Sequence, residues 1–175
     1  MTEAAIALGS NVGDRTGFLA SALRAIGALP GCRLTRVSSA YKTRPWGKTD
    51  QGEFINMCAL IDTDLSPADL LAAVKDVESS LGRTASERWG PREIDIDLLI
   101  IPGVEMRTED LTLPHPRMSE RLFVIAPLAE IAPDLTLGNQ RMDARAKALQ
   151  AAARPNDCVV DDEATELIKA VLETK

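Results

Sequence analysis

The chain has 175 residues, of which 45% are hydrophobic and 26% charged, and this composition is typical of a single globular domain. Its formal net charge of −6 argues against broad, nonspecific binding to nucleic acid or membrane surfaces. No run of about 18 apolar residues is present, and no basic segment followed by a long apolar one opens the chain, so we expect a cytoplasmic protein. The three cysteines are widely spaced, which predicts neither a disulfide framework nor a zinc site.

The first part of the chain shows patterns for a strand, a helix and two further strands. Ala4–Leu8 is a short apolar run that ends in a turn-rich segment. Asp14 is a suitable N-cap for a helix whose apolar residues recur at helical spacing until Pro30. Two more strands are expected at Leu34–Tyr41 and Phe54–Asp62, with a long loop rich in Pro, Gly and polar residues between them.

The next helix has the clearest boundaries. Ser66 is its expected N-cap, Pro67 occupies the first helical position, and Gly82 ends the apolar stripe. A strand that contains Asp95 and Asp97 follows, so the element order is β-α-β-β-α-β. This order predicts an α+β fold, a ferredoxin-like sandwich with two helices on one face of an antiparallel sheet.

The C-terminal part of the chain has a different character, and we divide the chain into a domain at 1–138 and an extension at 139–175. The Ala-rich segment Met142–Ala153 predicts a helix, and apolar residues at helical spacing between 164 and 172 predict another. We expect this helical extension to pack on the domain or on a second copy. The expected state is a monomer, with a dimer through the extension as the alternative.

Two carboxylates interrupt the apolar pattern of the strand around residue 96. Successive side chains of a strand alternate between its faces, so Asp95 and Asp97 share one face, roughly 6.5 to 7 Å apart. One interpretation is an edge strand with a solvated face. The other is a pair of ligands for hard divalent cations, which prefer carboxylate oxygens.

Several cationic side chains flank this carboxylate pair in the sequence. Arg83, Arg88 and Arg92 precede the strand, while Arg121 follows His115, the one histidine of the chain. Isolated ion pairs would explain some of these arginines. A polyphosphate bound together with a divalent metal ion would explain both sets, because carboxylates bind the metal and guanidinium groups bind phosphate oxygens. A phosphate-binding loop of the GxxxxGK[ST] type is absent from the sequence.

Three motifs occur together: Ala7–Asn11, Arg88–Arg92 followed in register by the two aspartates, and Pro114–Pro116 about twenty residues later. On these residues the chain, over roughly positions 4–137, resembles the 6-hydroxymethyl-7,8-dihydropterin pyrophosphokinase family. The resemblance implies the ferredoxin-like fold and a role in folate biosynthesis. It also implies transfer of pyrophosphate from ATP, the co-substrate, to the hydroxymethyl group of a reduced pterin, with release of AMP.

The resemblance implies roles for individual residues. Asp95 and Asp97 would hold two Mg²⁺ ions that bridge the ATP phosphates. The catalytic group would comprise these two aspartates with Arg83, Trp89 and Arg92. The further implied ATP contacts, beyond Arg83 and Arg92, are Leu71, Glu78, Arg88, Leu98, Thr112, His115 and Arg121. The implied pterin contacts are Thr43, Pro45, Trp46, Phe54, Asn56 and Phe123.

Some alternatives stay open at this point. Phe54 and Phe123 could be core residues, whereas Asn56 lies in an apolar run and needs a polar partner if it is buried. The loop reads Thr84-Ala85 where the family often has a second arginine, and Asp110 stands where some relatives have a basic residue. These departures allow a catalytically weakened paralogue that binds pterin or nucleotide. Another two-metal enzyme of nucleotidyl transfer is the remaining alternative.

Overall fold

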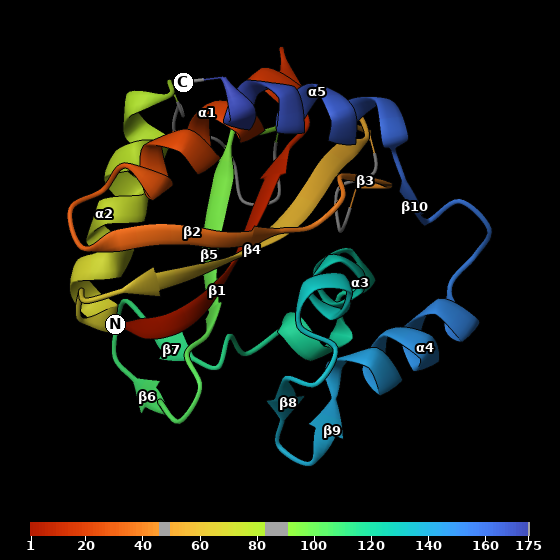
Figure 1. Ribbon diagram of the computed structural model, residues 1–175. Helices are drawn as coiled ribbons and strands as arrows, with labels where there is room; N and C mark the ends of the chain where they lie inside the picture. Colours follow the sequence, from red (N-terminus) through yellow and green to blue (C-terminus); the bar gives the residue numbers. More distant parts are fainter. Residues whose placement is uncertain (46–49, 83–90, 175) are drawn as a thin grey trace.

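The structure is a computed structural model that describes residues 1–45, 50–82 and 91–174. Six strands form one antiparallel sheet in the order β10-β3-β4-β1-β5, with β2 paired to β4 beside this path (Figure 1). The strands are β1 (Thr2–Ser10), β2 (Cys32–Val37), β3 (Tyr41–Thr43), β4 (Phe54–Thr63), β5 (Asp95–Ile100) and β10 (Cys158–Val160). Two small hairpins lie outside the sheet: β6 (Met106–Arg107) with β7 (Thr112–Leu113), and β8 (Thr136–Leu137) with β9 (Gln140–Arg141).

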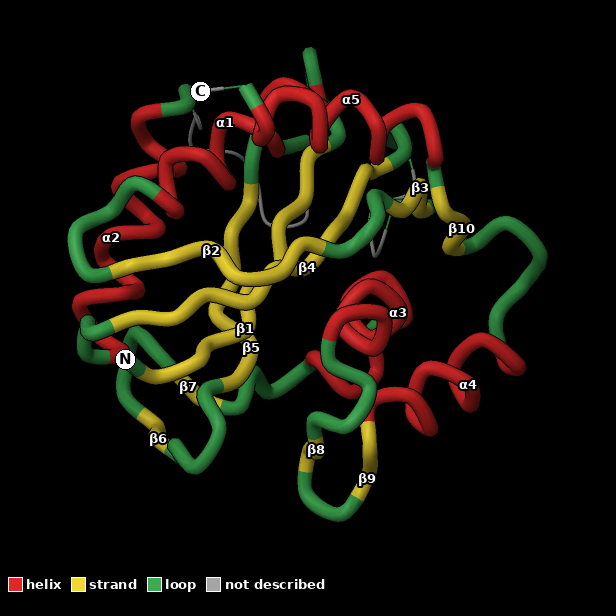
Figure 2. The backbone as a smooth tube through the Cα atoms, viewed as in Figure 1, coloured by secondary structure: helices red, strands yellow, loops and turns green. Residues whose placement is uncertain are grey.

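Helices cover both faces of the sheet (Figure 2). They are α1 (Arg15–Gly27), α2 (Pro67–Ser80), α3 (Leu122–Ile131), α4 (Met142–Ala152) and α5 (Asp162–Glu173), with a short 3-10 turn at Met118–Glu120. On one face, β1 residues such as Ile6 pack with Leu23 of α1, Val74 of α2 and Ile168 of α5. On the other face, Leu60 of β4 lies in a core cluster with residues of α3 and α4. The predicted ferredoxin-like sandwich is therefore confirmed, with α5 added to the layer of α1 and α2.

The predicted N-caps of the first two helices and the predicted end of the second are also found, whereas the first helix ends at Gly27, before Pro30. The Asp14 carboxylate accepts a hydrogen bond from the Gly17 amide at 3.0 Å. The Ser66 hydroxyl accepts one from the Asp69 amide at 3.2 Å. Gly82 follows α2 with a φ of 87°, a conformation that glycine adopts without steric cost. Local capping chemistry thus sets these boundaries.

The strand predicted at Leu34–Tyr41 is in fact two strands, which is a correction to the sequence analysis. β2 ends at Val37 and β3 begins at Tyr41, so the segment predicted as a loop starts with strand residues. Between them the Cys58 amide donates a hydrogen bond to the Ser38 hydroxyl at 2.9 Å. A side chain here takes the place of a backbone acceptor and interrupts the hydrogen-bond ladder with β4. Residue propensities do not reveal such an interruption.

The C-terminal residues pack on the rest of the chain in two places. α4 lies against α3, and α5 lies against α1, with Ala164 and Ile168 in the core. Between these helices, β10 adds a strand to the sheet next to β3, which the sequence analysis did not predict. The division at residue 138 stays a prediction, as does the oligomeric state.

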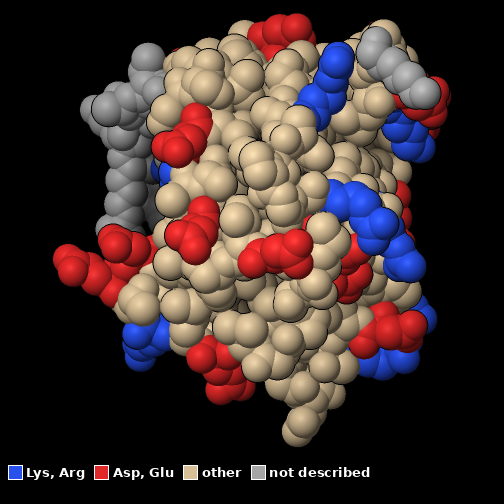
Figure 3. All heavy atoms as spheres, turned by 60° about the vertical axis from the view of Figure 1, so that its left-hand side comes forward, with Lys and Arg blue, Asp and Glu red and all other residues tan. Residues whose placement is uncertain are grey.

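The surface and the helices add two observations. On the face that carries α2, acidic and basic side chains lie dispersed among other residues (Figure 3). Among the helices in the described ranges, none combines the length and the apolar character that crossing a membrane requires.

Candidate active site

A pocket of about 400 Å³ opens on the face of the sheet that α3 covers. Its walls come from the ends of β1, β3, β4 and β5 and from the segment between residues 115 and 124. The lining residues are Ala7, Leu8, Gly9, Thr43, Arg44, Phe54, Asn56, Arg92, Asp95, Asp97, His115, Pro116, Arg117, Arg121, Phe123 and Val124. The pocket therefore joins residues that the sequence analysis assigned to ATP with residues that it assigned to the pterin.

The floor of the pocket is made by β1, the strand between β4 and β5, through Ala7, Leu8 and Gly9. Gly9 is in register with Asn56 of β4 on one side and with Asp95 of β5 on the other. Since neighbouring strands lie about 4.8 Å apart, the backbones of Asn56 and Asp95 are separated by roughly 10 Å across the floor. A flat ring bound at the amide and a phosphate bound at the carboxylates would therefore lie side by side.

The two carboxylates face this pocket from the edge strand of the described sheet. Asp95 Oδ1 forms an ion pair with Arg92 Nη1 at 2.8 Å. The pKa of Asp97 is raised to about 6, first because the carboxyl is buried and second because Asp95 lies beside it; Lys75 and Arg121 partly oppose this shift. Arg92 thus accounts for one carboxylate charge, whereas Asp97 is held in a setting that disfavours its ionised form.

Glu78 and Lys75 support the outer edge of β5 from α2. The Glu78 carboxylate is 2% exposed and accepts hydrogen bonds from the Ile96 amide at 2.6 Å and from Lys75 Nζ at 2.9 Å. Lys75 Nζ also donates to the Ile96 carbonyl oxygen at 2.9 Å. Both backbone groups of the residue between the aspartates are therefore bound by α2, which fixes the strand that presents the carboxylates.

The opposite wall carries His115, Arg117 and Arg121. His115 Nδ1 accepts a hydrogen bond from the Arg117 amide at 3.2 Å, which leaves Nε2 to carry the proton of the neutral ring. Burial, and then the charge of Arg121, lower the pKa of His115. The imidazole is therefore neutral near pH 7 and suited to donate a hydrogen bond. Arg121 supplies positive charge to this wall, because a guanidinium stays protonated.

The remaining wall combines an amide with aromatic rings. Asn56 Nδ2 donates to Thr43 Oγ1 at 2.6 Å, while Phe54 and Phe123 also line the pocket. A Cβ atom added to Gly9 would come within 2.4 Å of Asn56 Oδ1 and 3.7 Å of the Phe54 ring. Glycine is therefore required here because the amide lies directly over the backbone of β1.

The structure brings together nine of the predicted site residues, and their roles stay predictions. These nine are Thr43, Phe54, Asn56, Arg92, Asp95, Asp97, His115, Arg121 and Phe123. Pro45 lines a neighbouring cavity instead. Trp46, Arg83, Arg88 and Trp89 lie outside the described residues.

Four predicted ATP contacts do not line the pocket: Leu71, Glu78, Leu98 and Thr112. Leu98 alternates with the aspartates, so it faces the other side of β5 and packs in the core, and Leu71 packs against the same cluster. Thr112 lies in the hairpin strand β7. Their assignment to adenine stays a prediction.

Sequence analysis assigned no role to some pocket residues, including Ala7, Gly9 and Arg117, although Ala7 and Gly9 lie in the motif Ala7–Asn11. Gly9 carried a usable signal, because a glycine inside a strand often marks the close approach of another group. Arg117 follows His115 and belongs to the cationic side chains near the carboxylate pair, but turn arginines are common in any fold.

The carboxylate pair also bears on whether the pocket suits a magnesium ion. Among residues 1–45, 50–82 and 91–174, no three His, Cys, Asp or Glu side chains gather into a metal-binding group. Magnesium often binds through one or two carboxylates together with substrate phosphates and water. Two adjacent, half-buried aspartates fit this kind of site, and neutralisation of their mutual repulsion is a physical reason for a cation there.

Comparisons with known proteins give the family. The family model described as 7,8-dihydro-6-hydroxymethylpterin-pyrophosphokinase matches residues 5–133. A 2-amino-4-hydroxy-6-hydroxymethyldihydropteridine pyrophosphokinase of Methylorubrum extorquens is 49% identical over 140 residues, which is 80% of this chain and 89% of that protein. A protein of the same name from Bacillus subtilis is 49% identical over 126 residues, covering 72% of this chain and 75% of the relative.

A solved structure shows the same fold. A Plasmodium falciparum HPPK-DHPS structure superposes with a TM-score of 0.71 at 14% identity and covers 92% of this chain. This chain spans 46% of that longer protein, so the likeness bears on the fold alone. Since the family model matches more than half of the sequence, the chain belongs to the 7,8-dihydro-6-hydroxymethylpterin-pyrophosphokinase family.

Proposed function

We propose that this protein transfers pyrophosphate from ATP to 6-hydroxymethyl-7,8-dihydropterin, which gives AMP and the pterin diphosphate. The family match and the curated relatives support the reaction. The observation in the structure that carries the proposal is the position of Asn56 and Asp95 on either side of Gly9. One pocket thereby offers an amide and aromatic rings for a flat heterocycle next to carboxylates and arginines for a metal-bound polyphosphate.

In the proposed reaction, the hydroxymethyl oxygen of the pterin forms a bond to the β-phosphorus of ATP, and the proton of this hydroxyl is released to water. The bond between this phosphorus and the oxygen that links it to the α-phosphorus breaks, and AMP leaves. Arg92 and Arg121 offset the negative charge on the phosphates, and His115 donates a hydrogen bond to them through Nε2. Side chains that only hold and align the reactants are sufficient for phosphoryl transfer.

We assign Asp95 and Asp97 as the residues that would hold Mg²⁺. When bound, Mg²⁺ supplies positive charge that screens the phosphate oxygens and aligns the attacking and leaving groups. Arg92, the ion-pair partner of Asp95, also lines the pocket, where its guanidinium can bind phosphate oxygens.

The pterin is assigned to the wall around Asn56 and Thr43. The Asn56 amide can donate and accept along the edge of a pterin ring, and Phe54 and Phe123 offer aromatic faces for it. The residues that hold adenine stay with the predicted set Leu71, Glu78, Leu98 and Thr112. The substrates are small molecules, and we propose no nucleic-acid or membrane partner.

The test is an assay of the purified protein with ATP, Mg²⁺ and 6-hydroxymethyl-7,8-dihydropterin, followed by chromatography of the products. We expect AMP and the pterin diphosphate in equal amounts. Asp95→Ala and Asp97→Ala should each lower kcat/KM by roughly 100-fold or more, because loss of metal-bound charge stabilisation costs several kcal/mol. Asp134→Ala is the control, since this carboxylate is exposed and pairs with Arg141 away from the pocket.

Each other outcome has a meaning. Release of pyrophosphate in place of AMP would indicate a nucleotidyl-transfer enzyme. Pterin binding without any AMP would indicate a catalytically weakened paralogue. Activity in both aspartate variants equal to that of Asp134→Ala would refute the metal-binding role.

A further inference from the structure

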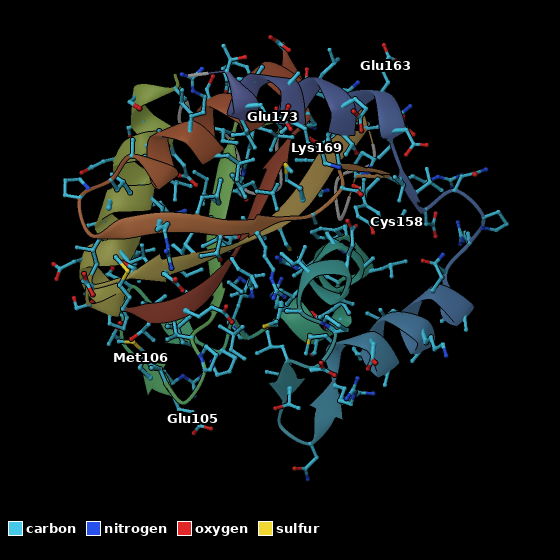
Figure 4. All side chains as sticks on the ribbon, viewed as in Figure 1. Glu105, Met106, Cys158, Glu163, Lys169 and Glu173 are labelled. Atoms are coloured by element: carbon cyan, nitrogen blue, oxygen red, sulfur yellow. The ribbon has the colours of Figure 1, made fainter. Side chains whose placement is uncertain are left out.

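The C-terminal residues 155–173, which we call the strap, lie beyond the residues that the family model matches. The strap comprises a turn at Pro155–Asp157, then β10 and α5. It crosses from α4 to the layer of α1, and on the way it runs beside β3 (Figure 1). Cys158, labelled in Figure 4, marks the start of this strand.

The strap contacts every residue from Ala40 to Arg44. β10 pairs antiparallel with β3 in the register Cys158↔Thr43, Val159↔Lys42 and Val160↔Tyr41. Because β3 pairs with β4 on its other side, β10 turns a three-residue edge strand into an internal strand. A strand bonded on both sides has less freedom to fray than an edge strand of this length.

Each end of β3 has an additional contact with the strap. At the start, the Ala40 amide donates to the Thr165 hydroxyl at 2.9 Å, and the Asp161 amide donates to the Ala40 carbonyl at 2.8 Å. At the end, the Arg44 amide donates to the Asp157 carbonyl at 3.3 Å, and Arg44 Nη1 lies 3.5 Å from Asp157 Oδ1. Thr165 is 5% exposed, so its hydrogen bond is shielded from water.

The residues that the strap contacts include part of the pocket wall to which we assign the pterin. Thr43 Oγ1 accepts the hydrogen bond of the Asn56 amide, and both Thr43 and Arg44 line the pocket. Arg44 also lines a second cavity, whose other wall includes Asp157 and Cys158 of the strap. The carboxylates, by contrast, lie on β5, at the opposite edge of the sheet from β10.

We propose that the strap is a positioning element for the pterin, which it sets through β3 and Arg44, while it leaves the ATP side of the pocket unaffected. This inference rests on the proposed function, since it takes the wall around Asn56 as the pterin site. The strap residues that act are Asp157 and Thr165; they touch neither pocket floor nor carboxylates, so their role is to position and not to react.

The test compares Asp157→Ala and Thr165→Val with the control Glu163→Gln. Glu163 is an exposed carboxylate of the same strap and points away from the sheet (Figure 4). We expect the KM for the pterin to rise roughly 2- to 5-fold in Asp157→Ala, as for a half-exposed ion pair. In Thr165→Val it should rise roughly 5- to 10-fold, as for a lost buried hydrogen bond. The KM for ATP should stay at the wild-type value in all three variants.

A second measurement does not depend on turnover. Hydrogen exchange of the amides of residues 41–44 should become faster in Asp157→Ala and Thr165→Val and stay unchanged in Glu163→Gln. If the wild type shows no pterin turnover but exchange follows this pattern, the proposed function fails, while the stabilisation of β3 by the strap is supported. The inference is overturned if exchange is unchanged, if both KM values rise together, or if faster exchange leaves the KM for the pterin unaltered.

Discussion

The two faces of the sheet have different roles, although the same strands form both. On the face of α1, α2 and α5, residues such as Ile6, Ile96 and Leu98 form a closed apolar core. On the face of α3, the alternate positions of β5 are Asp95 and Asp97, which face a pocket. Since side chains alternate along a strand, one face can supply stability while the other carries groups that burial disfavours.

The strand that carries the two aspartates is stabilised mainly by contacts on the apolar face and with α2. Ile96 lies between the two aspartates and is fully buried against the apolar face, and α2 binds both of its backbone groups. The carboxylates themselves repel each other. We therefore expect substitutions on the apolar face to alter folding and substitutions on the pocket face to alter ligand binding.

The largest expected effect is on the apolar face. Ile96→Ala should lower the free energy of unfolding by about 2 to 5 kcal/mol, because a fully buried side chain leaves a cavity. Urea unfolding measures this change. Leu167→Ala is the control, since this side chain is 53% exposed and should change stability by at most about 0.5 kcal/mol. Equal effects of the two substitutions would contradict the assignment of the core to this face.

A smaller effect is expected at the floor of the pocket. Gly9→Ala places a methyl group against Asn56 Oδ1, so the amide must move away from Thr43. We expect the Kd for the pterin to rise roughly 10- to 100-fold, which is the effect of losing one or two well-placed hydrogen bonds. Titration calorimetry with the pterin measures it.

A double-mutant cycle tests the cause of that effect. If displacement of the amide is responsible, Gly9→Ala should add little once Asn56→Ala has removed the amide. If Gly9→Ala weakens pterin binding as much in that background as in the wild type, the contact between the two residues is not the reason.

The smallest expected effect is a gain of stability on the pocket face. Asp97 has a pKa of about 6 in the fold against an ordinary value of 3.8, so the native state binds this proton more tightly than the unfolded chain does. The free energy of unfolding of the wild type therefore falls as the pH rises from about 4 through 6. Above pH 6 the full loss of stability from the ionised Asp97 is present. Asp97→Asn should raise the free energy of unfolding by about 1 to 2 kcal/mol at pH 8 without metal or nucleotide.

The pH dependence of this gain distinguishes it from a general packing effect. The difference between Asp97→Asn and the wild type should shrink as the pH falls from 8 to 4, because it vanishes once the pH is below 3.8 and the wild-type carboxyl is protonated in both states. Thermal melts at pH 4, 6 and 8 measure it. A gain that is the same at all three pH values would show that the charge of Asp97 is not its cause.

Local sequence patterns predicted the helices α1, α2, α4 and α5 and the strands β1, β4 and β5 of this protein. The caps at Asp14 and Ser66 act within three residues of the chain, so their chemistry can be read directly from the order of residues. The same holds for the alternation of Asp95 and Asp97 with apolar residues. By comparison, β10 has only three residues, and its pairing with β3 joins positions more than 100 residues apart.

For the site, too, the sequence predicted some features and only the tertiary structure showed others. Residue type and resemblance selected Asn56, Asp95, Asp97, His115 and Arg121, which do line one pocket. The alternation along β5 already places Leu98 on the face opposite the aspartates, but sequence alone could not show that Arg92 pairs with Asp95. It could not show that the C-terminal strap binds the strand of Thr43 either. Local composition determined which groups this protein carries, whereas the tertiary structure decided which of them meet, because pairing register and packing join residues that are distant in the chain.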